Sequence, residues 1–368
     1  MADRFSLLPD ELICHILTFL PTEDAFTTSF LSKRWKPLWL LLPNLDLDDV
    51  HFIKSGKSKS LLRKMMSILV QSVHQQHVRS IRLRCASASN YFEYEEEDSA
   101  NFNTWITAAA EEGLKHIHIH FSWIFNQLGF IFSLRTLVVL DLKFVCVHAF
   151  GKVDLPSLKT LRLNRVEFSL DFYLTKLLNG CPNLEEFEGI SLSSVVSWDT
   201  DIEYKSRSLS KLARASISHL DEFNIPFDIF SNVEFFLLKE IVLDDLPVFA
   251  NLTRVEVVYV RRSVYWKLVF GVFENCPKLQ EFFLGKPPIL ISEDILWYCP
   301  CVVPECLSLQ FRKCTVMNYM GEKYEKEFVK YIVENSTSLP EMAMHTPASL
   351  DPQRRLEIQN ELENYCNQ

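Results

Sequence analysis

Three histidines alternate with isoleucines in the run His116-Ile117-His118-Ile119-His120. On a β-strand, alternate side chains point to the same side, so the three imidazoles would share one face and could approach a metal ion together. Protein zinc sites usually combine such nitrogen ligands with cysteine or carboxylate ligands at recognisable spacings. No such partner accompanies these histidines, and we expect no metal site.

Ten cysteines are spread along the chain, four of them as Cys299, Cys301, Cys306 and Cys314. Their spacing lacks the paired knuckles of zinc ribbons. The N-terminal stretch carries acids where a signal peptide would need basic residues, so we expect reduced thiols that pack as small apolar side chains. Two similar stretches, NGCPNLEEFEGI and ENCPKLQEFFLG, contain Cys181 and Cys276, which we predict to be buried.

Motifs that mark common catalytic sites are absent. The 368 residues include nine glycines and contain neither a GxxxxGK[ST] nor a GxGxxG loop, and no HExxH or nucleophile elbow is found. The net charge of −9 disfavours nucleic-acid binding, and no apolar run is long enough to cross a membrane. We therefore predict a non-catalytic protein with no cofactor and with neither nucleic acid nor membrane as partner.

The elements that position the remaining side chains begin with N-terminal helices. Pro9, Asp10 and Glu11 favour a helix start, because proline suits the first turn and acids suit the positive end of the helix dipole. The residues that follow form one wide apolar face: Leu12, Ile13, Ile16, Leu17 and Leu20. Two or three short helices cannot bury so many apolar groups among themselves, so either a partner or the rest of the chain covers them.

The order of these residues resembles the F-box, in its plant form. The points of likeness are Leu8-Pro9-Asp10-Glu11-Leu12, Ile16-Leu17, Leu20-Pro21 and Leu31-Ser32-Lys33-Arg34-Trp35 with Leu38-Trp39; Phe26 and Phe30 are bulkier than is usual in that family. The resemblance implies binding to a Skp-type adaptor, which links the chain to a cullin and a RING subunit. Carried over by position, the adaptor-facing residues are Leu8, Pro9, Leu12, Ile16, Leu17, Leu20 and Pro21, with Leu31, Trp35 and Trp39 completing the unit.

Beyond a predicted linker and amphipathic helix over residues 51–77, and a solvated acidic loop over 86–101, the chain repeats itself. A loose L-x-x-L-x-L template has consecutive starts at residues 114, 134, 158, 184 and 209. Such steps are typical of leucine-rich repeats, with one strand and one helix or turn per unit. The template assigns strand positions to Leu137 with Val139 and to Ile241 with Leu243, and it degenerates around 193–236. We therefore predict an irregular solenoid over residues 78–300.

Strand alternation predicts which side chains such a solenoid presents on its open face. If the template leucines point inward, the residues between them point outward. The face would run from basic to acidic along the chain, and it either binds a protein substrate or is an ordinary solvated surface. Its candidate binding residues are Arg82, Arg84, His118, Arg162, Glu186, Glu188, Glu256 and Glu281.

Residues 301–345 are predicted to cap the solenoid with a strand, a helix and a second strand. Tyr324, Phe328, Tyr331 and Ile332 form an apolar helical stripe, and a strand runs from Glu341 to His345. The segment resembles the FBD domain that follows F-box and leucine-rich repeats in many plant proteins, at residues 303–307, 328–332 and 335–344. Asp351-Pro352 opens a final polar helix in the tail, residues 346–368.

The chain is thus predicted to be an α/β protein with an F-box over residues 1–50, an irregular leucine-rich-repeat solenoid and an FBD-like cap. The resemblance implies the substrate-recognition subunit of a Skp–cullin–F-box ubiquitin ligase, located in the cytoplasm, the nucleus or both. The alternative is a repeat scaffold or ligand receptor whose F-box serves a complex unrelated to ubiquitin.

Overall fold

The computed structural model describes residues 7–48, 67–68, 78–85, 96–121, 128–148, 150–196, 206–219, 225–241, 243, 245–259, 266–287, 302–337 and 341–366. The predicted linker over 51–77 and Cys299 and Cys301 lie almost wholly outside these residues. The chain divides into two compact units: unit 1 contains residues 1–184 and 192–204, and unit 2 contains residues 185–191 and 205–368.

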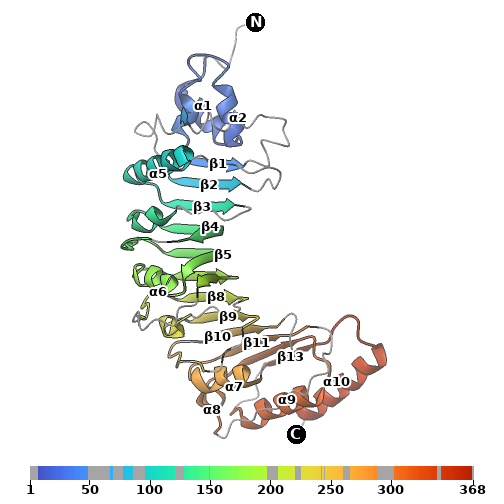
Figure 1. The fold of residues 1–368 in the computed structure, drawn as a ribbon. Helices are drawn as coiled ribbons and strands as arrows, with labels where there is room; N and C mark the ends of the chain where they lie inside the picture. The colour runs from blue at the N-terminus through green and yellow to red at the C-terminus, as the bar shows by residue number, and fades with distance from the viewer. Residues whose placement is uncertain are drawn as a thin grey trace. The chain divides into compact units, whose positions relative to one another are not determined.

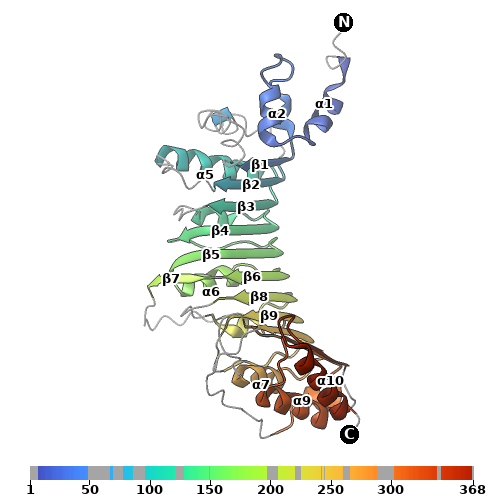
Figure 2. The same cartoon turned by 90° about the vertical axis from the view of Figure 1, so that its right-hand side faces the viewer.

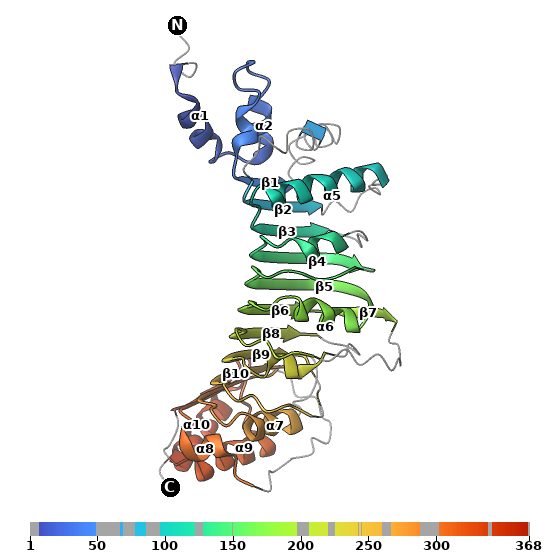
Figure 3. The ribbon, with the colours of Figure 1, turned by 90° about the vertical axis from the view of Figure 1, so that its left-hand side faces the viewer.

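Unit 1 begins with helices and continues as a parallel sheet with strand order β1-β2-β3-β4-β5, to which β7 adds by pairing with β5. Its strands are β1 (Asn44–Asp48), β2 (Ser80–Cys85), β3 (His116–Phe121), β4 (Val139–Val147), β5 (Thr160–Leu170) and β7 (Ser193–Val196). Its helices are α1 (Asp10–Leu17), α2 (Thr22–Thr28), α5 (Glu96–Glu111) and α6 (Phe172–Asn179), with 3₁₀ helices η2 (Leu38–Leu41) and η4 (Gly129–Ser133). Figures 1 and 3 show the strands stacked in chain order.

The core of unit 1 is built from rows of aligned aliphatic side chains. One row crosses β1 to β5 in register, and each of its side chains is at most 2% exposed: Leu45, Ile81, Ile117, Leu140 and Leu161. Burying one such side chain stabilises the fold by about 1.5–3 kcal/mol. Parallel strands need long crossover connections, and α5 and η4 lie in two of them.

The strand register corrects the repeat template at two places. In β4 the buried residues include Leu140 and Leu142, three residues beyond the predicted Leu137 and Val139. In β9 they are Phe236 and Leu238, which precede the predicted Ile241. Leucines recur every few residues in both stretches, so the sequence admits two frames and only pairing with neighbouring strands selects one.

Two predicted irregular stretches also contain regular elements. The acidic stretch predicted as a loop already enters helix α5 at Glu96. The stretch 193–236, predicted to be degenerate, contains β7, β8 and the start of β9, and β8 pairs with its neighbours residue for residue.

Unit 2 is a parallel sheet with strand order β6-β8-β9-β10-β11-β12-β13. Its strands are β6 (Glu186–Ile190), β8 (Arg214–Ser218), β9 (Phe235–Lys239), β10 (Arg254–Val258), β11 (Glu281–Gly285), β12 (Lys313–Met317) and β13 (Glu341–His345). Its helices are α7 (Trp266–Asn275), α8 (Glu305–Leu309), α9 (Lys323–Asn335) and α10 (Pro352–Cys366), with 3₁₀ helix η5 (Phe227–Phe230). In Figure 1, α7, α8 and α9 gather at one side of these strands.

Aromatic rings fill the space between these helices and the sheet. Phe273 lies 4.8 Å from Phe282 of β11 and 5.5 Å from Phe311, and Phe328 lies 5.2 Å from Trp266 (ring centroids). The structure has the predicted α9 stripe, the strand from Glu341 to His345 and the final helix that starts at Pro352. The predicted strand-like start of this segment is instead the short helix α8 followed by β12.

The cysteines that the structure describes are free thiols. Cys181 and Cys276 are buried as predicted, and so are Cys306 and Cys314. Burial raises the pKa of Cys181 and of Cys306 to about 12, so these thiols stay protonated and serve as packing groups.

A buried ion pair lies among the described residues of unit 2. Lys286, just beyond β11, pairs with Glu325 in the first turn of α9, and the two side chains are 6% and 3% exposed. The second carboxylate oxygen of Glu325 accepts hydrogen bonds from the backbone amides of Met320 and Glu322, each at 2.9 Å. This glutamate therefore ties the start of α9 to the end of a central strand.

Replacing Glu325 by glutamine should leave the buried ammonium of Lys286 without its counter-charge. We expect the free energy of unfolding to fall by about 3–5 kcal/mol, measured by urea denaturation. The matched control is Glu334→Gln on the same helix. Its partner Lys330 lies 3.7 Å away in an exposed pair, so the loss should stay below about 0.5 kcal/mol. Equal losses for both variants would contradict a structural role for the buried pair.

Candidate functional site

The first candidate site is the surface of α1. Pro9 and Pro21 stand at the N-caps of α1 and α2, and acids occupy the first turn of each helix. Arg34 holds the start of α1: its Nη2 lies 2.6 Å from Asp10 Oδ1 and also donates to the carbonyl oxygen of Leu8. A guanidinium with two acceptors fixes both position and orientation.

The wide apolar face of α1 is divided between the protein interior and the surface. Ile13 and Leu17, one turn apart, are fully buried, and in the same helical unit the rings of Phe26 and Trp39 pack edge to face at 5.0 Å. Leu12 and Ile16, on the adjacent stripe, are 50% and 39% exposed. One stripe thus forms the core of the helical unit, and the other is available to a partner.

The candidate adaptor residues fall into the same two groups. The exposed group contains Pro9, Leu12, Ile16, Leu20, Pro21 and Leu31, with Leu8 partly exposed. The buried group contains Leu17, Trp35 and Trp39. Leu17 is fully buried in this structure, so its expected contact with the adaptor stays a prediction that burial does not favour. Sequence reasoning missed three more exposed residues, Leu7, Phe19 and Phe30, at 77%, 75% and 59%.

The helical unit is joined to the sheet of unit 1 through β1. The backbone amide of Asp46 donates a 2.8 Å hydrogen bond to Oγ1 of Thr22, a residue 3% exposed at the start of α2. β1 then pairs with β2 over its whole length. Figure 2 shows α2 directly above β1. The residues that end the predicted F-box are thus also the first strand of the sheet.

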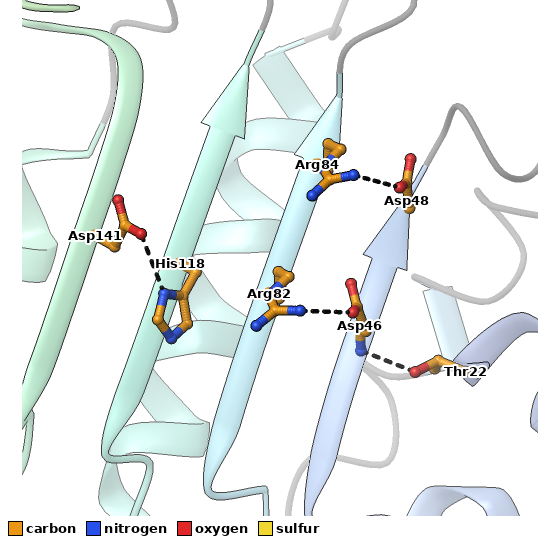
Figure 4. A network of polar contacts seen from close by, with 7 residues as sticks. All are labelled: Thr22, Asp46, Asp48, Arg82, Arg84, His118 and Asp141. Atoms are coloured by element: carbon orange, nitrogen blue, oxygen red, sulfur yellow. Dashed lines mark hydrogen bonds and ion pairs between the residues drawn. The ribbon is translucent and has the colours of Figure 1, made fainter. Parts of the chain in front are cut away.

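The second candidate site is the open strand face of unit 1, drawn in Figure 4. Arg82 and Arg84 are exposed as predicted, but each lies 3.2 Å from an aspartate of β1, Asp46 and Asp48 respectively. His118 lies 3.4 Å from Asp141 of β4. The predicted basic field is therefore largely neutralised, because β1 places two carboxylates beside the arginines.

The alternating histidines lie on this face as expected. Burial lowers the pKa of His116, aided by His118, and burial lowers that of His120, aided by Arg84 and Lys143. These two imidazoles are neutral at pH 7, and the His120 ring stacks on Phe144 at 5.5 Å. Across the described ranges, no cluster of three or more His, Cys, Asp or Glu side chains could hold a metal ion.

The remaining candidate residues lie on the outward side of their strands. Arg162 of β5 is partly exposed in unit 1, and so are Glu186, Glu188 and Glu256 in unit 2. Glu256 and Glu281 lie 2.6 Å and 3.6 Å from Arg254, so the acidic part of the face also contains a basic partner.

A grouping that resembles a nucleophile with a base occurs at β4 and β5. Cys146 Sγ lies 3.8 Å from His148 Nδ1 and donates to Glu167 Oε1 at 3.5 Å. Burial and this carboxylate raise the pKa of the Cys146 thiol to about 11, and the residue is 1% exposed. A protonated, enclosed thiol is a poor nucleophile, so the surroundings of Cys146 favour packing over nucleophilic attack.

Comparisons with known proteins agree with both resemblances. The F-box domain model matches residues 5–46, and the FBD model matches residues 300–344. An F-box/FBD/LRR-repeat protein of Arabidopsis thaliana is 26% identical, covering 98% of this chain and 96% of its own length. An FBD-associated F-box protein is 26% identical over 94% of this chain and 89% of its own, and another F-box/FBD/LRR-repeat protein is 31% identical over 57% and 46%. The chain carries an F-box and an FBD domain, and its Arabidopsis homologues extend across most of it.

The division of α1 into two stripes can be tested by truncating one leucine in each. Leu17→Ala should lower the free energy of opening of α1 by about 2–5 kcal/mol, because it empties a packed site. Leu12→Ala, on the exposed stripe, should cost about 1 kcal/mol or less. Hydrogen–deuterium exchange of the α1 amides measures both. Faster exchange in Leu12→Ala than in Leu17→Ala would reverse the assignment of the stripes.

Proposed function

We propose that this chain is the substrate-recognition subunit of a Skp–cullin–F-box ubiquitin ligase. The F-box binds a Skp-type adaptor, and through it a cullin and a RING subunit. The strand faces hold a protein substrate for ubiquitination. The chain itself is non-catalytic, needs no cofactor and acts in the cytoplasm, the nucleus or both.

One observation carries the proposal: an apolar stripe left uncovered within the segment that matches the F-box model. Leu12, Ile16, Leu20 and Leu31 are all at least 39% exposed, although the helical unit buries other leucines completely. Contiguous exposed apolar side chains mark interaction surfaces. The Arg34 contacts with Asp10 and Leu8 hold this stripe in a fixed orientation, which lowers the entropic cost of binding.

We further propose that the strand layers are leucine-rich repeats. In support, each unit stacks strands in register with aliphatic rows on the inner side, and relatives bear LRR-repeat names. Each layer then buries its apolar residues only against its neighbours, which makes the layers of a unit mutually dependent for stability.

The mechanism that follows is proximity. Docking at the F-box and capture on a strand face place substrate lysines near activated ubiquitin, which raises their effective concentration. The candidate substrate contacts are Arg82, Arg84, His118 and Arg162 in unit 1 and Glu186, Glu188, Glu256 and Glu281 in unit 2. β1 supports this role, because its pairing with β2 and its bond to Thr22 join the docking helices to the first layer of the sheet.

Polar substitution of the exposed stripe should abolish adaptor binding without unfolding the chain. In Leu12→Gln/Ile16→Gln, we expect retention of a Skp-type adaptor in a pull-down to fall at least about tenfold, because each side chain contributes on the order of 1 kcal/mol or more when buried. Glutamine keeps good helix propensity, so the thermal midpoint should be preserved.

The matched control is Leu356→Gln, at an exposed leucine on α10. It should leave adaptor retention unchanged. Cullin recovery in the same pull-down distinguishes a ubiquitin ligase from a different F-box complex: adaptor without cullin would contradict the ligase role. Undiminished adaptor retention by the double variant would contradict the docking surface.

A further inference from the structure

Unit 2 contains a hollow of about 410 Å³ beside the first residues of three neighbouring strands. Arg214 of β8, Phe235 of β9 and Arg254 of β10 are direct register partners and line it. Their side chains form a sandwich: the two guanidinium carbons lie 5.0 Å and 5.6 Å from the centroid of the Phe235 ring. The ring therefore holds both cations in place by cation–π attraction.

The two arginines differ in their counter-charges. Arg254 lies 2.6 Å from Glu256 and 3.6 Å from Glu281, so its charge is compensated. Arg214 is exposed; among the described residues its guanidinium contacts the Phe235 ring and forms no ion pair or hydrogen bond with a carboxylate. Its donors are thus pre-oriented at the hollow and available for a planar anion.

Acidic groups at the hollow restrict which anion fits. Glu256 lines it, and so does Glu234, an exposed residue that forms no ion pair within the described part of the chain. A doubly charged phosphate would be repelled by both carboxylates, whereas a singly charged carboxylate would gain the bidentate contact with Arg214 at a smaller cost. Glu234 in turn suits a cationic group beside that carboxylate.

We propose that this hollow binds an aspartate or glutamate side chain of the recruited protein, next to a lysine or arginine that pairs with Glu234. The inference rests on the proposed function, because it names the chemistry that a recruited protein presents. It also adds Arg214 and Phe235 to the candidate binding residues. Strand alternation alone does not identify either residue as a binding residue, because the hollow depends on the alignment of the first residues of three strands.

The test uses the full chain and three probes: the blocked dipeptide acetyl-Glu-Lys-amide, its acetyl-Gln-Lys-amide analogue, and inorganic phosphate. Ligand-observed NMR titration should show the glutamate probe binding at least about tenfold more tightly than either of the others, the lower end of the range for one charge-assisted hydrogen bond. Preference for phosphate, or equal binding of the glutamine probe, would overturn the proposal.

Variants locate the binding. Arg214→Gln should weaken binding of the glutamate probe about tenfold, and Arg214→Lys should restore part of the loss, since lysine keeps the charge without the planar fork. Arg312→Gln, an exposed arginine that does not line the hollow, should change nothing. Should Arg214→Gln lower the thermal midpoint, Phe235→Leu provides a second variant, expected to weaken binding by loosening Arg214. Equal effects at Arg214 and Arg312 would contradict the site.

Adaptor pull-down and the probe titration, both on the unaltered chain, separate this inference from the proposed function. Retained adaptor together with no glutamate-selective binding would refute the hollow and leave the ligase role standing. Glutamate-selective binding that depends on Arg214, in a chain that fails to retain the adaptor, would support the hollow as a peptide site and refute the ligase role.

Discussion

The residue-for-residue register of the parallel strands is the constraint on which the other features depend. A parallel strand satisfies its backbone only if the next strand lies alongside it, and a slip of one residue would turn every inward side chain outward. Leu45 to Leu161 in unit 1, and Val255 with Phe282 in unit 2, are aligned in this way. The same alignment places Asp46 beside Arg82, and Arg214 beside Phe235, on the opposite face.

The sequence predicted the elements that depend on local residue patterns. The F-box motif, the α9 stripe with Phe328 and the strand from Glu341 to His345 depend on short-range periodicity and on capping residues, and the structure has them. The sequence did not predict which residues face inward where strand pairing determines the register. Leu137 and Leu140 are equally good template residues, and only the pairing of β4 with β3 selects Leu140.

Surface charge could not be predicted for the same reason. In the sequence, Arg82 and Arg84 look like a basic patch. In the structure they pair with Asp46 and Asp48 of β1, a strand that lies more than thirty residues earlier in the chain. Arg214 and Phe235 are unremarkable in the sequence, and their sandwich with Arg254 exists only because three strands begin at one level. Side chains that meet across strands are separated in the sequence by loops of variable length, so no fixed sequence spacing predicts these contacts.

The position of β1 also limits how such a protein can be recombined. The F-box model ends at residue 46, within the strand that pairs with β2. A crossover at Pro43 would replace the first strand together with the rest of the sheet, and the incoming segment would have to supply its own backbone amide as donor to the Thr22 hydroxyl oxygen. A crossover after Asp48 would keep β1, and the first strand of the incoming segment would have to pair with it in register. The F-box segment and the sheet therefore share one strand, and that strand continues to Asp48, beyond residue 46 where the F-box match ends.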